Sequence, residues 1–406
     1  MMKKIILLLF LCSFYSCHVA KEAKSSTADR AEALAHKFII TDGHVDLPYR
    51  LKVLNFRFQK EYIGLPVSSE EGNFDFVRAK KGGLDAPFMS VYIPSNLNIQ
   101  ESKELADTLI RMVNWISKEN SEYFEVATSP AEVKNIVGKG KIALPMGMEN
   151  GSPIETLEDV KYWREKGISY VTLTHAKDNQ ICDSSYDTTG TWNGLSKFGE
   201  EVVRSLPKEG IMIDVSHISD SAFYDVLAIT PVPLLASHSS ARNFTPKFQR
   251  NMSDEIIRAM GKNGGVIMIN FSSIFLDGSY EVQLQKDQAE IDAMLKEKGV
   301  TAESEEGKNL IRDYRQKKPQ FFSDVEKVAD HIDHVVALAG INHVGFGSDF
   351  DGVGDSLPSG LKDVSGYPNL IRSLLKRGYS ENDIEKICSG NLFRVWQATL
   401  DYQLSK

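Results

Sequence analysis

The chain has 406 residues, of which 42% are hydrophobic, and a formal net charge of -8 at pH 7. This length and composition suit one large α/β domain or two ordinary ones. The mild negative charge is spread along the chain, which favours solubility and argues against nucleic acid as a partner. Past the N-terminus no apolar stretch approaches the roughly 20 residues needed to span a bilayer, which argues against a bundle of membrane spans.

The N-terminal residues have the pattern of a targeting segment. A pair of lysines precedes an apolar run over residues 5–12, as in a signal peptide. Cys17 follows a small residue and resembles the lipid-attachment site of bacterial lipoproteins, with a plain secretory signal as the alternative. We therefore expect residues 1–17 to be a signal peptide with lipidation at Cys17, and residues 18–36 to be a tether. The protein is then exported and held by lipid at the bacterial cell envelope, facing the periplasm or the surface.

Two further cysteines, Cys182 and Cys388, lie about 200 residues apart. Export permits a disulfide. A single far-separated pair without a motif does not indicate one. We expect both to be free thiols.

From residue 37 to the C-terminus, short apolar segments alternate with helical patterns. Eight of these segments are rich in Ile, Val and Leu and are bounded by polar residues, as buried parallel strands are. They cover residues 38–46, 86–93, 142–149, 170–175, 211–217, 234–238, 265–271 and 343–349. Eight strands that alternate with helices predict one α/β domain, a (β/α)8 barrel of the TIM type over residues 37–406.

A long insertion follows the seventh predicted strand. It covers residues 272–322 and contains two polar helical patterns, 280–298 and 305–316. Because it leaves the active-site end of the barrel, it is either part of a lid, an oligomer contact or a solvated helical hairpin. A homodimer is therefore left open.

Metal-ligating or acidic side chains close six of the predicted strands. In chain order they are His44 with Asp46, Glu149, His175, His217, His238 and Asp349. The active sites of such barrels lie where the C-terminal ends of the strands converge, so we expect these side chains to meet. The alternatives are histidines that only fill the core and a Glu149 that caps a helix or pairs with a lysine.

Three imidazoles with two carboxylates suit zinc. Five ligands exceed what one tetrahedral catalytic zinc uses, so two ions that share Glu149 fit the count better. His44 and Asp46 then complete one site, and His217 and His238 complete the other. Ions roughly 3.5–4 Å apart can share a hydroxide made at neutral pH, which predicts hydrolysis with two Zn²⁺ per chain.

The sequence resembles the membrane (renal) dipeptidases, a branch of the amidohydrolase-like metal-dependent barrels. The matching segments are Asp42–Pro48, Phe88–Tyr92, Gly147–Gly151, Leu173–His175, Gly194–Gly199, Ile213–His217, Ser237–Ala241, Arg250–Asn251 and Gly345–Gly352. They span residues 39 to about 397, which is nearly the whole chain after the tether. The resemblance implies a zinc-dependent dipeptidase for small dipeptides that tolerates a D-residue at the C-terminal position.

The resemblance also implies roles for single residues. Glu149 bridges the ions, His175 contacts the substrate and stabilises the tetrahedral intermediate, and Asp349 handles the proton. Arg250 corresponds to the arginine that binds substrate, with Arg242 as its rival because residues 239–250 are about one residue longer than usual. Two cations nearby are expected to hold the pKa of Asp349 low. The alternative for Asp349 is a sixth ligand that only organises the site.

Two other functions compete with this one. The first is a related barrel amidohydrolase that acts on a lactone, a phosphotriester or a cyclic amide. Many such enzymes bridge their metals with a carboxylated lysine, whereas no predicted strand here ends in lysine. The second is a binding lipoprotein without catalysis, for which the loss of Asp349 or of a ligand would be the sign, and all of these residues are present.

Overall fold

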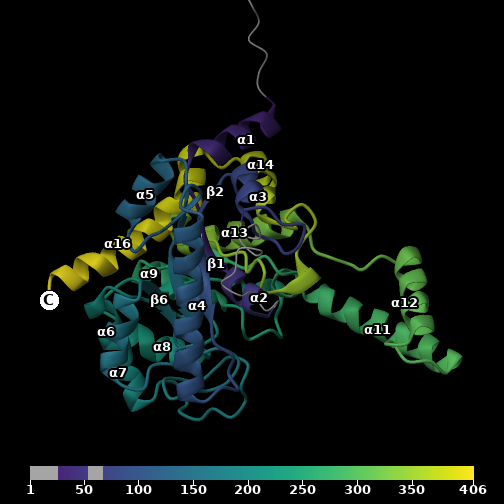
Figure 1. The fold of residues 1–406 in the computed structure, drawn as a ribbon, viewed down its shortest axis with the longest axis horizontal. Helices are drawn as coiled ribbons and strands as arrows, with labels where there is room; N and C mark the ends of the chain where they lie inside the picture. The colour runs from purple at the N-terminus through teal and green to yellow at the C-terminus, as the bar shows by residue number, and fades with distance from the viewer. Residues whose placement is uncertain (1–25, 54–66) are drawn as a thin grey trace, which may run out of the picture.

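The structure, a computed structural model, describes residues 26–53 and 67–406, so the predicted signal peptide and Cys17 lie outside it. Its centre is an eight-stranded parallel sheet with the strand order β1-β2-β5-β6-β7-β8-β9-β10. These strands are β1 Ile40–Val45, β2 Leu84–Tyr92, β5 Met146–Glu149, β6 Ile168–Thr172, β7 Met212–Asp214, β8 Leu235–Ala236, β9 Val266–Ile269 and β10 Val344–Phe346. The sheet edges meet where Asp46 donates its N–H to the carbonyl of Phe350 over 2.8 Å. The predicted (β/α)8 barrel is confirmed (Figure 1).

The third predicted strand, residues 142–149, is two strands instead of one. It breaks at Pro145, because proline has no N–H to donate to a ladder. The first part, β4 (Ile142–Leu144), pairs with β3 (Phe124–Val126) in a separate two-stranded sheet, and only β5 enters the barrel. Glu149 is the last residue of β5, so the prediction that it closes a barrel strand holds.

Helices surround the barrel and begin at the caps that the sequence indicates. Ser129, for example, accepts the N–H of Glu132 at the start of α5, with proline at the first helical position. The helices outside the insertion are α1 Thr27–Lys37, α2 Leu47–Val53, α3 Phe76–Gly82, α4 Ile99–Glu119, α5 Pro130–Gly138, α6 Leu157–Glu165, α7 Lys197–Ser205, α8 Asp220–Ile229, α9 Asp254–Asn263, α13 Val325–Ala339, α14 Tyr367–Lys376, α15 Glu381–Glu385 and α16 Asn391–Leu404. Among the described helices, none combines the length and apolar character that crossing a membrane requires.

The second half of the predicted tether is folded. Residues 27–37 form α1, which begins with a reciprocal capping box between Ser26 and Asp29. Its residues Ala31, Leu34 and Ala35 are buried, and the helix packs beside α14 (Figure 1). The folded chain therefore begins about ten residues before the predicted boundary at residue 37.

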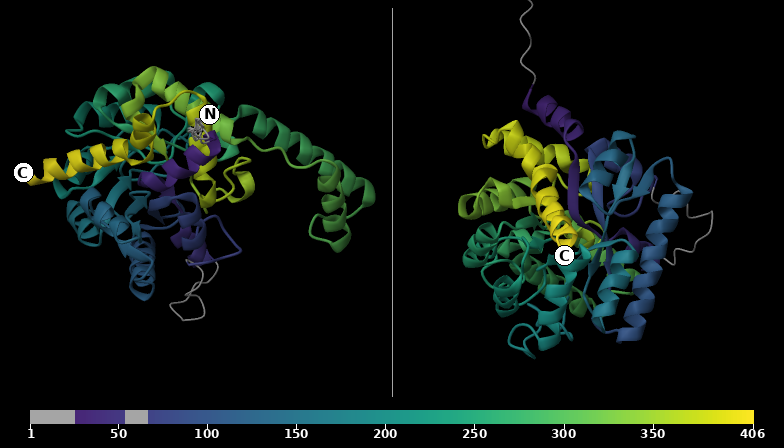
Figure 2. Two further views of the ribbon diagram at one scale, coloured as in Figure 1. Left: turned by 90° about the horizontal axis from the view of Figure 1, so that it is seen from above. Right: turned by 90° about the vertical axis from the view of Figure 1, so that its left-hand side faces the viewer.

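The insertion forms an arm that extends away from the barrel (Figures 1 and 2). After the short helix α10 (Ser273–Leu276), α11 (Gly278–Lys298) and α12 (Glu305–Lys317) run as a helical hairpin. The carboxylate of Asp287 on α11 joins the two, at 2.6 Å from the guanidinium of Arg315 and 3.0 Å from the ammonium of Lys318. This shape corresponds to the solvated hairpin among the three alternatives, and the oligomer contact stays a prediction.

The interior of the barrel is apolar at the end where the strands begin. Phe88 and Trp396 meet there with their ring centroids 5.1 Å apart. Trp396 belongs to α16, which crosses this end, and Asn391 of the same helix donates to the carbonyl of Val344 at the start of β10. We call this end the floor and the opposite end, where the strands finish, the mouth.

Candidate metal centre at the barrel mouth

The backbone turns sharply where the strands finish at the mouth. Among the described residues, five that are not glycine have a positive φ, and four of these follow β5, β7 or β10. They are Asn150 (86°), His217 (71°), Asp349 (63°) and Asp351 (66°). Left-handed backbone costs an ordinary residue energy and collects at functional sites, where it directs particular side chains. Here it occurs at His217 and Asp349, whose side chains both belong to the cluster of metal-ligand candidates.

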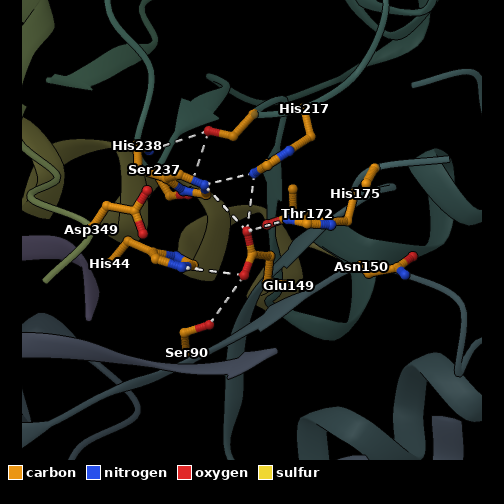
Figure 3. Close-up of polar contacts among 12 residues, drawn as sticks. His44, Ser90, Glu149, Asn150, Thr172, His175, His217, Ser237, His238 and Asp349 are labelled. Atoms are coloured by element: carbon orange, nitrogen blue, oxygen red, sulfur yellow. Dashed lines mark hydrogen bonds and ion pairs between the residues drawn. The ribbon is translucent and has the colours of Figure 1, made fainter. Parts of the chain in front are cut away.

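The carboxylate of Glu149 lies at the centre of the mouth, and histidines from different strands point at it (Figure 3). Its Oε1 lies 3.0 Å from Nε2 of His217, 3.3 Å from Nε2 of His238 and 3.6 Å from Nε2 of His175. Its Oε2 lies 3.3 Å from Nε2 of His44. One oxygen therefore faces the ends of β6, β7 and β8, and the other faces β1.

A second group of acids surrounds His44. Nε2 of His44 lies 3.3 Å from Oδ2 of Asp46, and one ligand atom each from His44, Asp46 and Asp349 lie within 4.8 Å of one another. The same holds for His44, Glu149 and His238, and for Glu149, His175 and His217. The structure thus brings together all seven predicted strand-end residues. The groups differ from the predicted pairing of ligands in that His238 lies close to His44 as well as to His217.

Burial and mutual charge set the protonation of this cluster. Burial alone raises the pKa of Glu149, but the imidazoles of His44 and His175 outweigh it and hold the pKa well below the ordinary range. Burial lowers the pKa of His217 and of His238 well below the ordinary value. The site therefore offers an ionised carboxylate and two neutral imidazoles, which are the forms that bind a metal ion.

His44 behaves differently. Burial lowers its pKa, but the nearby Tyr170, Glu149 and Asp46 outweigh this effect and raise the pKa well above the ordinary value. The surroundings of His44 thus favour positive charge at this position. A divalent cation supplies such a charge in place of the proton.

Asp349 is buried beside this cluster, and its Oδ2 accepts a hydrogen bond of 2.8 Å from the amide of Asn270. Burial raises the pKa of Asp349 to about 7; His44 opposes the rise, while the carboxylates of Asp46 and Glu149 add to it. The side chains alone therefore do not hold this pKa low. The low value expected from the sequence depends on bound cations and stays a prediction.

His175 and Arg250 flank the cluster. The ring of His175 lies edge-on to Tyr92, with centroids 4.9 Å apart. Arg250 is buried, donates over 2.6 Å to Oγ of Ser239 and over 2.8 Å to the carbonyl of His238, and lies over the Phe275 ring.

Arg242, the predicted rival of Arg250, is engaged elsewhere. Its guanidinium makes two hydrogen bonds to the carboxylate of Asp220, of 2.7 and 2.6 Å, and a third to the carbonyl of Asn251. A guanidinium held in a bidentate pair has little to offer a substrate. Arg250 differs in that its Nε has no hydrogen-bond partner among the described residues, and neither arginine lines the cavity over the cluster, so the choice of Arg250 stays a prediction.

A cavity of about 790 Å³ opens over the cluster. The described residues that line it include the aromatic side chains of Tyr49, Tyr92, Tyr186 and Phe275. Among the described residues, Phe275 is the part of the insertion that reaches it, so the arm contributes its base and not its tip. The volume lies within the range of pockets that enclose small ligands.

Other residues at the site were not identified from the sequence. Tyr170 contacts His44, and Ser237 contacts both His238 and Asp214. Asp214 could have been identified from the sequence, because an acidic residue inside an apolar strand needs hydrogen-bond partners when it is buried. Tyr170 could not have been identified in this way, since an aromatic residue in a strand is typical of an ordinary hydrophobic core.

The donor set fits a metal ion. Among the described residues, Nε2 of His44 and Oδ1 of Asp46 are buried and have no hydrogen-bond partner. Leaving such atoms unpaired is costly, and a cation between them removes the cost. Imidazole nitrogens with carboxylate oxygens are the ligands that zinc and similar borderline ions take. Cys182 and Cys388, in contrast, are buried free thiols outside this cluster, and the prediction of free thiols is confirmed for them.

Comparison with known proteins supports the resemblance seen in the sequence. The profile of the membrane dipeptidase family, peptidase family M19, matches residues 28–405. Dipeptidase 3 of Mus musculus is 30% identical over 376 residues, which cover 91% of this chain and 66% of the mouse protein. An uncharacterized dipeptidase of Schizosaccharomyces pombe is 29% identical over 406 residues, with 95% of this chain and 87% of the yeast protein covered. The chain thus spans just under two thirds of the mouse relative.

Solved structures share the fold. The probable dipeptidase PvdM of Pseudomonas aeruginosa superposes with a TM-score of 0.76 at 24% identity, covering 93% of this chain and 99% of that one. A metallo peptidase of Rhodobacter sphaeroides, liganded with a phosphinate mimic of the dipeptide L-Ala-D-Ala, superposes with a TM-score of 0.73 at 22% identity, covering 89% and 99%. At these identities the likeness establishes the barrel, and the site rests on the residues described above.

Proposed function

Because the chain belongs to the membrane dipeptidase family, peptidase family M19, we propose that it hydrolyses dipeptides with the help of two zinc ions. The observation that carries this proposal is the position of Glu149. Its two oxygens face two different sets of ligands, His217 with His238 on one side and His44 on the other. A carboxylate placed in this way suits a bridge between two ions better than a ligand of one.

The proposed ligands are those predicted from the sequence. His44, Asp46 and Glu149 hold one ion, and Glu149, His217 and His238 hold the other. When bound, the ions lower the pKa of a water molecule toward neutrality and polarise the peptide carbonyl. His44 lies in β1 and Asp46 directly follows the last residue of that strand, so a single backbone segment positions both.

Asp349 is the proposed proton carrier. Attack of water on a peptide carbonyl releases a proton, and the leaving amine must gain one. Asp349 lies at the mouth next to the ligands, is held by Asn270 and is nearly enclosed. Gly352 makes this possible, because a Cβ there would come within 2.4 Å of Oδ1 of Asp349 and 2.1 Å of Oδ2 of Asp46.

Arg250 and His175 are the proposed substrate-binding residues. Arg250 uses two of its guanidinium nitrogens on Ser239 and His238, while its Nε is buried and unpaired among the described residues. A carboxylate is the partner that such a guanidinium favours, and the C-terminus of a dipeptide supplies one. His175 lines the cavity beside Glu149, where it can donate to the carbonyl oxygen as that oxygen gains negative charge.

The proposal extends to dipeptides with a C-terminal D-residue. It is supported by the family resemblance and by the L-Ala-D-Ala mimic bound to the related peptidase of Rhodobacter sphaeroides. The cavity of about 790 Å³ is large enough for both residues of a dipeptide. The alternative of a barrel hydrolase with a carboxylated lysine has less support, since Glu149 lies where that lysine would bridge.

A substrate panel tests the proposal. Free L,L and L,D dipeptides are compared with their C-terminal amides and with tripeptides, using protein reconstituted with Zn²⁺. We expect the free dipeptides to be cleaved, the amides to be poor substrates, and Arg250→Lys to raise KM at least tenfold, because a lysine cannot form the bidentate pair. Arg242→Lys is the matched control and leaves KM near the wild-type value. If the amides are cleaved as well as the free dipeptides, Arg250 does not bind the C-terminal carboxylate.

We also propose that the protein is exported and anchored by lipid at Cys17, on the strength of the N-terminal pattern. Cys17→Ser is then expected to move the protein from the membrane fraction to the soluble fraction with the same specific activity. Retention of this variant in the membrane fraction would point to an uncleaved signal anchor.

A further inference from the structure

The hydroxyl of Tyr170 reaches across the barrel to His44. Tyr170 lies in β6, is fully buried and packs against Phe88 with ring centroids 5.4 Å apart. Its Oη lies 3.0 Å from Nδ1 of His44 and donates over 3.0 Å to the carbonyl of Gly43. Gly147 leaves the space for this ring, because a Cβ there would overlap Cζ of Tyr170 at 1.9 Å. The packing of the barrel interior thus holds one phenol against one metal-ligand candidate.

His238 is also held by a buried side chain, in this case a serine hydroxyl that is hydrogen-bonded to a carboxylate. Its Nδ1 lies 2.7 Å from Oγ of Ser237, and that hydroxyl donates over 2.6 Å to Oδ2 of Asp214. Asp214 is itself fixed, since its Oδ1 accepts the N–H groups of Ser216 and Ser237 and its Oδ2 accepts the hydroxyl of Thr172. All of these groups are buried.

Each hydroxyl has a single proton. The partner that accepts this proton determines which ring nitrogen of the neighbouring histidine carries a hydrogen. A carbonyl can only accept, so the Tyr170 proton goes to Gly43 and Oη is left to accept from Nδ1 of His44. Ser237 likewise donates its only proton to Oδ2 of Asp214, so Oγ is left to accept from Nδ1 of His238. In both rings Nδ1 therefore carries the hydrogen and Nε2 faces Glu149.

We propose that Tyr170 and the Ser237–Asp214 pair are positioning residues that hold His44 and His238 with Nδ1 protonated and Nε2 presented as a metal ligand. This inference rests on the metal site of the proposed function. It goes beyond that site in assigning a separate support to each ion: Tyr170 to the ion beside His44, and Ser237 with Asp214 to the ion beside His238. Groups that orient metal ligands in this way commonly contribute ten- to a hundredfold to metal affinity.

Metal titration of three variants tests the two supports. Tyr170→Phe removes only the hydroxyl and keeps the ring, while Ser237→Ala and Asp214→Asn interrupt the second support. Zinc is added to metal-free protein in competition with a chelator, so that the two binding steps are resolved. We expect Tyr170→Phe to weaken one step about tenfold or more and Ser237→Ala and Asp214→Asn to weaken the other, each leaving the remaining step within about threefold.

Matched controls separate positioning from packing. Ser373 is buried and donates to a carboxylate, that of Glu326, over the same 2.6 Å, but between α13 and α14. Tyr379 likewise donates to Asp333 over 2.7 Å. Ser373→Ala and Tyr379→Phe are expected to lower the unfolding temperature as much as their counterparts do while leaving both zinc affinities unchanged.

An NMR measurement keeps the inference testable independently of the metal count. In metal-free protein, long-range ¹⁵N–¹H correlation is expected to find Nδ1 of His238 protonated in the wild type, and this preference is expected to be lost in Ser237→Ala. A single zinc per chain with this tautomer intact would contradict the binuclear proposal and leave the role of Ser237 standing. Zinc affinities that stay within threefold in all three variants, or equal losses at both steps, would overturn the inference.

Discussion

The two ends of the barrel use the same strands in opposite ways. At the floor, Phe88 of β2 and Trp396 of α16 fill the interior with apolar surface. At the mouth, the side chains are carboxylates and imidazoles, nearly all of them buried, and their ligand atoms lie within 4.8 Å of one another in groups of three. Burial at the floor stabilises the fold. Burial at the mouth costs energy unless each group has a partner.

The residues that stabilise the fold and the residues proposed for function therefore lie at opposite ends of the barrel. Left-handed backbone at His217 and Asp349 lies at the mouth, as do Nε2 of His44 and Oδ1 of Asp46, which have no hydrogen-bond partner among the described residues. At the floor, Nε1 of Trp396 is a buried atom of the same kind. The floor and the helix packing around it hold that unfavourable arrangement in place. Substitutions at the mouth are therefore expected to change metal binding and rate, whereas substitutions at the floor are expected to change stability.

The largest effect is expected from Glu149→Gln. A neutral amide bridges two cations poorly, so both ions are held less tightly and kcat/KM falls on the order of 10³-fold or more. The folded structure changes little, because the amide keeps the shape of the side chain. Elemental analysis after dialysis, together with circular dichroism, checks this. A variant that keeps both ions and wild-type activity would show that Glu149 is not the bridge.

Asp349→Asn tests the next step of the reaction. If Asp349 carries the proton, kcat falls roughly 10²–10⁴-fold, while metal content and KM stay near wild type. If Asp349 is only a sixth ligand, metal is lost and excess Zn²⁺ restores the activity. Steady-state kinetics with and without added zinc distinguishes the two, and rescue by zinc alone would refute the assignment.

Trp396→Ala tests the same comparison at the floor of the barrel. Removing this fully buried ring leaves a cavity, and we expect a loss of about 3–5 kcal/mol in the free energy of unfolding. Zinc content and kcat/KM of the folded protein, measured at low temperature, are expected to stay within twofold of wild type. Denaturant unfolding gives the first quantity. A variant of normal stability that has lost zinc would show that floor and mouth are not separate.

Much of the mouth was predictable because the signal repeats. One strand that ends in histidine says little, but His175, His217 and His238 follow three successive strands, β6, β7 and β8, and a parallel barrel brings the ends of such strands together. The split of the third strand was also visible in Pro145. The helix at residues 27–37 was missed because its composition resembles a tether, although the capping box from Ser26 to Asp29 was present.

The supports of the ligands were not predictable in the same way. The hydroxyl of Tyr170 meets His44 from 126 residues away, and only the curvature of the closed barrel sets that contact. The direction of the arm is a second case. The pattern of α11 and α12 predicts two helices, but the way they leave the barrel depends on the loops at their base.

The smallest expected effect is a pH dependence of stability at His331, away from the site. Its Nδ1 accepts the N–H of Ala241 and its Nε2 donates to the carbonyl of Leu276, so the folded state needs the neutral ring. Burial lowers its pKa to about 4. The stabilisation is complete above pH 6.5, the ordinary value, and is lost as the pH falls from there to about 4.

This loss amounts to about 3 kcal/mol in the free energy of unfolding. Denaturant unfolding at several pH values measures the slope, and His331→Gln serves as the comparison because its amide can accept and donate without titrating. The variant is expected to show a shallower slope over this range whatever its absolute stability. An identical slope in both proteins would show that His331 does not contribute.

The central claim is that the strand ends of the mouth hold two ions that share Glu149. Titrating metal-free protein with Zn²⁺ while following dipeptide hydrolysis tests it most directly, with bound zinc measured in the same samples. We predict that activity rises until about two ions are bound per chain and then levels off, in line with a binuclear site. Full activity with one tightly held ion per chain would contradict this account.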